Sequence, residues 1–176
     1  MLRELVADRE IRALNDTAFA VTPALREAYA SGDDEELAEV AMAEAARASL
    51  RLLADQQAAT EEFDGLDADG AGDDTAAPVR GPIFRRAVIA ADVDEATLRP
   101  DLDDAVVRLV AAIPYDRIAS VHVDLAEAEP EIAKAVDVID AADMGDTDAE
   151  FVLGDAEDHQ LAWYAAQELP FLLDLL

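Results

Sequence analysis

The sequence has no cysteine and a single lysine, Lys134. The absence of cysteine excludes disulfides, thiolate metal sites and a cysteine nucleophile. Apolar runs are short as well, and none approaches the roughly 20 residues that a membrane-spanning helix needs. The first residues, MLRELVADRE, carry acids where a secretory signal would be basic and then apolar. We therefore expect a cytoplasmic protein.

Basic side chains are scarce throughout the chain. The 176 residues include 41 Asp and Glu against 13 Lys and Arg, so the formal net charge is −28. Nucleic acids and anionic membranes are bound through basic patches, so we expect neither as a partner. The charge favours solubility and cationic partners instead. Such acidity fits a salt-rich cytoplasm or GC-rich coding, and both explanations remain open at this point.

Catalytic and cofactor-binding signatures are missing too. The sequence contains no GxGxxG or GxxxxGK[ST] phosphate loop, no GxSxG or SxxK serine motif, and no HExxH zinc motif. We predict no cofactor and favour a non-enzymatic protein.

Apolar periodicity and end signals predict several helices. The most regular begins at Asp33 and Asp34 and carries a wide apolar stripe. Shorter helices begin at Pro23, with Thr22 as the cap, and at Pro130. The expected helices cover residues 2–14, 23–30, 33–53, 130–145 and 155–169.

Alternating β-branched and apolar residues predict short strands between these helices. They cover residues 17–22, 83–93, 105–111 and 118–124, with a short edge strand at 150–153. The expected fold class is α+β, with a small mixed β-sheet and amphipathic helices packed mainly on one face. At this length we expect one domain, residues 1–176.

Residues 58–82 interrupt this pattern. They are acidic, contain four glycines and nearly lack bulky apolar side chains. This composition predicts a flexible acidic insert in the middle of the domain. The insert is either a lengthened loop, which costs little closure entropy, or a binding segment for a basic partner.

A dense acidic cluster follows between residues 143 and 159. Its acids alternate, and Glu157 is the twelfth residue counting from Asp146, which is the ligand spacing of an EF-hand calcium loop. Phe151 stands at the sixth position, where the sharp turn of such a loop needs glycine. The cluster is therefore a metal site or a solvated connection to a helix capped by Asp155. The candidate metal ligands are Asp146, Asp148, Glu150, Asp155 and Glu157.

Both histidines lie near carboxylates. His159 is a candidate acid–base group with Asp158 and Glu150, or a first-turn histidine whose charged form its acidic neighbours hold. His122 and Asp124 alternate along a strand, so with a third ligand they would hold a metal. A half-exposed sheet face explains that pair equally well.

Two further segments have more than one interpretation. Arg85 and Arg86 are the only two adjacent basic residues. They either bind an acidic ligand or lie at a solvated strand edge and pair with local carboxylates. The apolar run after Pro170 packs on the core or meets a partner. The aromatic pair before it suits a core, a partner or a small ligand. The candidate interaction residues are Trp163, Tyr164, Phe171, Leu172 and Leu175.

Five blocks of sequence together resemble one family. They are FAVTPALRE from Phe19, ARASLRLL from Ala46, VHVD from Val121, DAEF from Asp148 and DHQLAWYAAQELP from Asp158. The chain resembles a family of uncharacterised actinobacterial proteins over nearly its whole length apart from the insert. The resemblance implies a bacterial, cytoplasmic setting and GC-rich coding, and no particular activity. It also implies a short strand before the first helix. This chain begins inside that helix, so we expect an unpaired sheet edge where the strand would pair.

The favoured function is therefore that of a small acidic protein acting through protein–protein contacts, with another protein or with copies of itself. The alternative is a divalent-metal-dependent hydrolase that uses the Asp/Glu/His cluster at residues 146–159.

Overall fold

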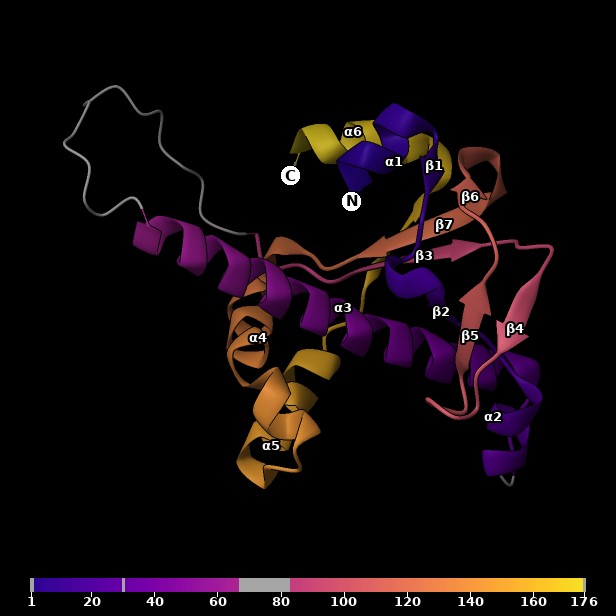
Figure 1. Ribbon diagram of the computed structural model, residues 1–176, viewed down its shortest axis with the longest axis horizontal. Helices are drawn as coiled ribbons and strands as arrows, with labels where there is room; N and C mark the ends of the chain where they lie inside the picture. The colour runs from indigo at the N-terminus through magenta and orange to yellow at the C-terminus, as the bar shows by residue number, and fades with distance from the viewer. Residues whose placement is uncertain (1, 30, 67–82, 176) are drawn as a thin grey trace. The chain divides into compact units, whose positions relative to one another are not determined.

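The computed structural model describes residues 2–29, 31–66 and 83–175 (Figure 1). Within these ranges the chain forms six α-helices and three small antiparallel sheets, which confirms the predicted α+β class. The predicted single mixed sheet is corrected to three separate sheets, because every strand pair is antiparallel and no strand joins two sheets.

The described chain packs as two compact units, each with its own buried apolar residues. What we call the sheet unit comprises Met1–Arg47, Ala87–Val123 and Leu161–Leu176, and the helical unit comprises Ala48–Arg86 and Asp124–Gln160. The long helix α3 (Asp34–Leu66) contributes its first part to the sheet unit and the remainder to the helical unit. One domain spanning residues 1–176 stays a prediction.

The helical unit is built on α4 (Glu129–Asp143) and α5 (Thr147–Glu157), which pack on each other. Its core contains Ile132 and Ile139 of α4, Leu153 of α5 and Leu50 of α3. The helix predicted to start at Pro130 is therefore confirmed, and it buries one apolar face.

Local signals set the boundary between these two helices. Gly145 has φ +88°, a conformation that costs glycine little, and it ends α4 as predicted. Asp146 then caps α5, because its carboxylate accepts hydrogen bonds from the backbone N–H groups of Asp148 and Ala149, both at 3.0 Å.

The sheet unit contains the three sheets. The first has the order β3–β7–β8, and one of its faces packs on Leu5, Leu169 and Leu172. The three strands of this sheet are β3 (Ala87–Ala91), β7 (Ile118–Val123) and β8 (Ala162–Ala165). The helices over this face are α1 (Leu2–Asp8) and α6 (Leu169–Leu175), which lie side by side (Figure 1).

The remaining sheets are smaller. One has the order β2–β5–β4, and the other is the pair β1–β6. Their strands are β1 (Glu10–Ile11), β2 (Thr17–Phe19), β4 (Ala96–Leu98), β5 (Val106–Leu109) and β6 (Ile113–Pro114). A second apolar cluster joins α3 to α2 (Pro23–Ala28), whose predicted cap is confirmed because the Thr22 hydroxyl accepts from the N–H of Leu25 at 3.1 Å.

Several predicted boundaries are wrong. The first helix ends at Asp8 instead of reaching Leu14, and β4 lies in the stretch between two predicted strands. α3 continues to Leu66, so residues 58–66 are helical rather than part of the insert; residues 67–82 lie outside the described residues.

The largest error concerns the end of the chain. Residues 150–153 are helical in α5 rather than an edge strand, and the predicted helix 155–169 is replaced by the end of α5 followed by β8. Pro170 lies in the first turn of α6 instead of ending a helix. An aspartate can cap a helix at residue 146 or at residue 155, and the glycine stop at Gly145 favours the earlier one.

No helix in the described part of the chain is long and apolar enough to cross a membrane.

Candidate functional site: the open edge of β8

β8 is an edge strand of the sheet β3–β7–β8, and among the described residues no strand pairs with its outer side. Its central residues are Trp163 and Tyr164, and aromatic side chains favour strands. Successive side chains point to opposite faces, so Tyr164 packs against the core while Trp163 points away from it. The side chain of Trp163 is left largely in solvent, since the residue is 61% exposed.

The backbone of β8 also directs N–H and C=O groups outward on this edge, away from β7. The N–H of Ala165 donates to the carboxylate of Glu168 at 2.9 Å, so it does not pair with β7. Residues in an antiparallel pair alternate between those that bond across the pair and those that bond outward. Trp163 is two residues before Ala165, and its N–H and C=O therefore point outward as well.

The turn after β8 is fixed from within the sheet unit. The hydroxyl of Tyr115 donates to the carbonyl of Ala166, directly after the strand. Tyr115 is buried, and the guanidinium carbon of Arg9 lies 3.6 Å from the centre of its ring. These contacts hold β8 in place, so the exposed indole is carried on a supported strand.

His122 of β7 is the residue directly opposite Trp163. The pair is of the kind without cross-strand hydrogen bonds, in which side chains on the same face lie about 5 Å apart at Cβ. Burial lowers the pKa of His122 below its ordinary value. The imidazole beside the indole is therefore uncharged at neutral pH.

The ring of His122 also contacts a serine. Its Nε2 lies 3.0 Å from Oγ of Ser120, two residues earlier on β7. A hydroxyl beside a neutral imidazole is the first half of a serine nucleophile, but a third group must orient the imidazole. Ser120 is buried, and none of the carboxylates in the described ranges hydrogen-bonds to His122. The pair has neither the access nor the third member that catalysis requires.

The predicted metal ligands lie on α5, because Asp146 is its cap and the other four occupy the helix. Eleven of the twelve residues of the EF-hand-like spacing, 147–157, are thus helical and Asp146 is their cap, so a helix stands where the spacing predicted a calcium loop. Across residues 2–29, 31–66 and 83–175, the structure forms no group of three or more His, Asp or Glu placed to hold a metal. Asp148, Glu150, Asp155 and Glu157 stay untested as ligands of any other kind.

The predicted acid–base group has a structural contact through its backbone. The carbonyl of His159 accepts a hydrogen bond from Nη2 of Arg86 at 2.6 Å, and its N–H donates to the carbonyl of Ala156. Asp158 follows α5 as its C-cap, and Glu150 lies in the first turn of that helix. A catalytic role for these side chains stays a prediction.

Arg86 forms a buried ion pair that the sequence did not predict. Its Nε and Nη2 donate to the two carboxylate oxygens of Asp124 at 2.9 and 2.8 Å, and its backbone N–H donates to the same carboxylate at 2.8 Å. The two side chains are 3% and 0% exposed. Arg86 therefore does not lie at a solvated edge, and the carboxylate of Asp124 is occupied by arginine. Its neighbour Arg85 does pair with a local carboxylate, Glu129, at 2.6 Å.

The predicted interaction residues divide into two groups. Leu172 is buried in the core and Tyr164 packs partly against it. Trp163 and Phe171 remain in solvent, at 61% and 72% exposure. Leu175 lies in α6, but its side chain falls outside the described part. Among the described side chains of the apolar run after Pro170, Leu172 and Leu173 are thus core and Phe171 is exposed.

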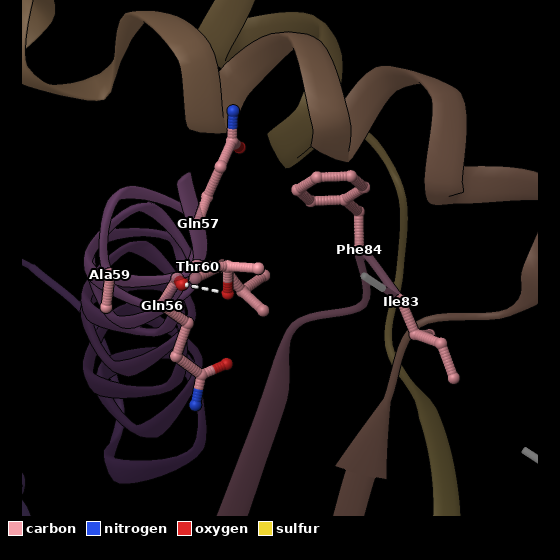
Figure 2. A pocket seen from close by; sticks show the side chains of 7 residues that line it. Gln56, Gln57, Ala59, Thr60, Ile83 and Phe84 are labelled. Atoms are coloured by element: carbon pink, nitrogen blue, oxygen red, sulfur yellow. Dashed lines mark hydrogen bonds between the residues drawn. The ribbon is translucent and has the colours of Figure 1, made fainter. Parts of the chain in front are cut away.

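A shallow hollow of about 340 Å³ lies in the helical unit, lined by Leu53, Gln56, Gln57, Ala59, Thr60, Ile83 and Phe84. Figure 2 shows the Thr60 hydroxyl hydrogen-bonded to the backbone carbonyl of Gln56, at 2.9 Å. None of the lining side chains is titratable or a metal ligand. The hollow offers packing, amide and hydroxyl contacts, and no titratable group lines it.

Fold and site together define a small α+β protein with an exposed tryptophan on an edge strand. Residues 1–173 match a family of unknown function, DUF6912, and the chain belongs to this family. No curated protein and no solved structure matches it. The expected membership in a family without a known activity is confirmed; a bacterial, actinobacterial origin stays a prediction.

Proposed function

We propose that this protein is a non-enzymatic cytoplasmic protein that acts by binding another protein, with Trp163 at the centre of the contact. The observation that supports this proposal is the 61% exposed indole on an edge strand. Tryptophan is the residue type most enriched among those that dominate binding energy at protein interfaces.

The indole is exposed although the sheet unit has a core that could hold aromatic residues. Tyr164, its neighbour in sequence, packs against that core, and Tyr115 is buried in it. A large apolar side chain that stays in water lacks the stabilisation of about 1.5–3 kcal/mol that full burial would give. A partner surface that covers Trp163 would recover this free energy on binding.

The apolar C-terminal run supports the proposal less than its sequence implied. Leu169, Leu172 and Leu173 belong to the core beneath the sheet, so their removal would damage the fold. Phe171 is exposed and stays available as a second contact residue. Trp163 therefore replaces the run as the centre of the proposed contact.

A photo-crosslinking amino acid at position 163 tests this proposal in the cells that make the protein. Positions 144 and 151 provide matched controls, because Met144 and Phe151 are 83% and 73% exposed and lie in the helical unit. We expect a discrete protein adduct from position 163 and none from the controls. The same adducts from all three positions, or none from position 163, would overturn the proposal.

The metal-dependent hydrolase gains no supporting observation, since its proposed ligands lie on α5 without converging in a ligand group among the described residues. A thermal melt in EDTA and then with calcium, magnesium, manganese or zinc, at matched ionic strength, tests it directly. Matching is needed because any salt screens a net charge of −28. A saturable rise for one ion that Asp148→Asn abolishes would restore this alternative.

A further inference from the structure

We propose that the partner contributes a basic, extended segment, which adds as a strand to the open edge of β8 and places a Lys or Arg side chain over the indole of Trp163. This inference rests on the proposed protein-binding function and specifies the chemistry of the partner.

The backbone of Trp163 provides the pairing groups. Its N–H and C=O point away from β7, as the outward bond of Ala165 to Glu168 indicates. An extended peptide satisfies such groups by adding a strand to the sheet, with main-chain hydrogen bonds for affinity and side-chain contacts for specificity. A helix presented by the partner would leave these groups unpaired.

Glu168 limits where the added strand can pair. Its carboxylate already accepts from the N–H of Ala165, so the last residue of β8 is closed to a partner. The free part of the edge is centred on Trp163. A segment that pairs there has side chains beside the indole, on the face of the sheet that carries His122.

The indole favours a cation. The face of a tryptophan ring attracts Lys and Arg more strongly than the other aromatic rings do. His122, directly opposite, is kept neutral by burial, so it neither repels an incoming cation nor competes for the ring as a cation itself. A basic side chain from the partner is the charged group that this surface accommodates best.

The charge of the chain favours the same partner. No Lys or Arg follows Lys134, so residues 135–176 carry acidic charges only, with Glu168 next to the strand. A second copy of this chain would bring a further charge of −28 to the interface and would repel the first. Between self-pairing and a basic segment, electrostatics select the basic segment.

The only Trp of the chain is the one in the site, so its fluorescence reports binding without a label. The probe is a short synthetic peptide that alternates Arg and Val, titrated into the full chain at about 0.15 M salt. We expect a saturable change in emission and protection of Trp163 from acrylamide quenching. A peptide with Glu in place of Arg should bind at least about tenfold more weakly.

A third peptide separates strand pairing from attraction between opposite charges. It carries the same Arg residues, but alternate backbone nitrogens are methylated and cannot donate hydrogen bonds. We expect about tenfold weaker binding, since main-chain bonds supply the affinity in strand addition. Equal binding of the methylated peptide, or of the Glu peptide, would overturn the inference.

Calorimetry on variants assigns the site. Trp163→Leu should weaken binding of the Arg–Val peptide about tenfold, whereas Phe151→Ala, at an exposed residue of the helical unit, should leave it unchanged. Equal loss in both variants, or sedimentation showing that the chain pairs with itself through this edge, would also overturn the inference. A protein adduct at position 163 combined with no peptide binding would reject the basic strand while leaving protein binding intact.

Discussion

The two units differ in whether they bury the residues that are least typical of their surroundings. The helical unit buries the groups that most need water, Arg86 and Asp124, and matches each of them with hydrogen bonds. The sheet unit leaves the side chain that most needs burial, Trp163, in solvent. The buried ion pair is explained by contacts inside the protein, but the exposed indole is not. The comparison therefore assigns a structural role to the ion pair, and the proposed binding role gives the exposed indole its explanation.

The largest effect should come from breaking the buried ion pair. Asp124→Ala removes one partner and leaves the Arg86 guanidinium buried without its carboxylate, so we expect a loss of about 3–5 kcal/mol in the free energy of unfolding. Urea denaturation measures it. The joint replacement Arg86→Met with Asp124→Leu should cost less, because no lone charge remains. A loss below about 1 kcal/mol for the single change would show that water reaches the pair.

The next largest effect is expected from a buried residue of α6, compared with an exposed residue on the same helix. Leu169 is fully buried and Phe171 is exposed, so Leu169→Ala should cost about 2–5 kcal/mol while Phe171→Ala stays within about 0.5 kcal/mol. Both changes shorten an apolar side chain on the same helix, and denaturant midpoints compare them directly. Similar losses would mean that Phe171 is covered, for example by self-association, and would weaken the contrast between core and contact residues.

A smaller effect distinguishes the two possible helix caps. Asp146→Ala should cost about 1 kcal/mol, because it removes the acceptor for two N–H groups of α5. Asp155→Ala should be neutral or slightly stabilising, since that acid lies near the C-terminal end of the helix, where negative charge is unfavourable. Thermal unfolding of the two variants gives the comparison, and a larger loss at residue 155 would contradict the helix boundaries.

The pH dependence of His122 should be smaller still. Its pKa in the folded chain is lowered by burial from an ordinary value of 6.5. As the pH falls through about 6.5, the unfolded chain therefore binds a proton first and the folded state loses stability. The loss stops growing once folded His122 is protonated too. Unfolding between pH 7 and pH 5 should be less pH-dependent in His122→Gln, with His159→Gln as control. An unchanged slope would show that His122 is not responsible.

The smallest expected effect on stability carries the most weight for function. Trp163→Ala should change the free energy of unfolding by no more than about 0.5 kcal/mol, because little of the side chain is buried on folding. The same variant should lose binding of the Arg–Val peptide. A large loss of stability would place Trp163 with the structural residues and remove the contrast between the two units.

Local signals in the sequence predicted some of the helix ends correctly. The cap at Thr22, the start at Pro130 and the stop at Gly145 all depend on neighbouring residues, and each is confirmed. Asp33 likewise caps α3 by accepting from the N–H groups of Glu35 and Glu36. Such features need no distant partner, so a single sequence is enough to find them.

Features that depend on distant partners were missed. Arg86 and Asp124 are 38 residues apart, and no local pattern links them. β8 was predicted as a helix because Leu161, Ala165, Leu169 and Leu172 happen to follow helical spacing, although adjacent aromatic residues favour a strand. Trp163 was identified as a candidate contact from its type alone. Its exposure could not be predicted, since that follows from β8 being the outer strand of its sheet.

The scarcity of two residue types gives each unit its own optical marker. The only Trp lies in the sheet unit, and the only Lys, with 61% of its side chain exposed, lies in the helical unit. An acceptor dye attached to the amine of Lys134 would receive energy from excited Trp163. The distance between the two markers, with and without a basic peptide, can thus be measured as energy transfer in the unaltered sequence.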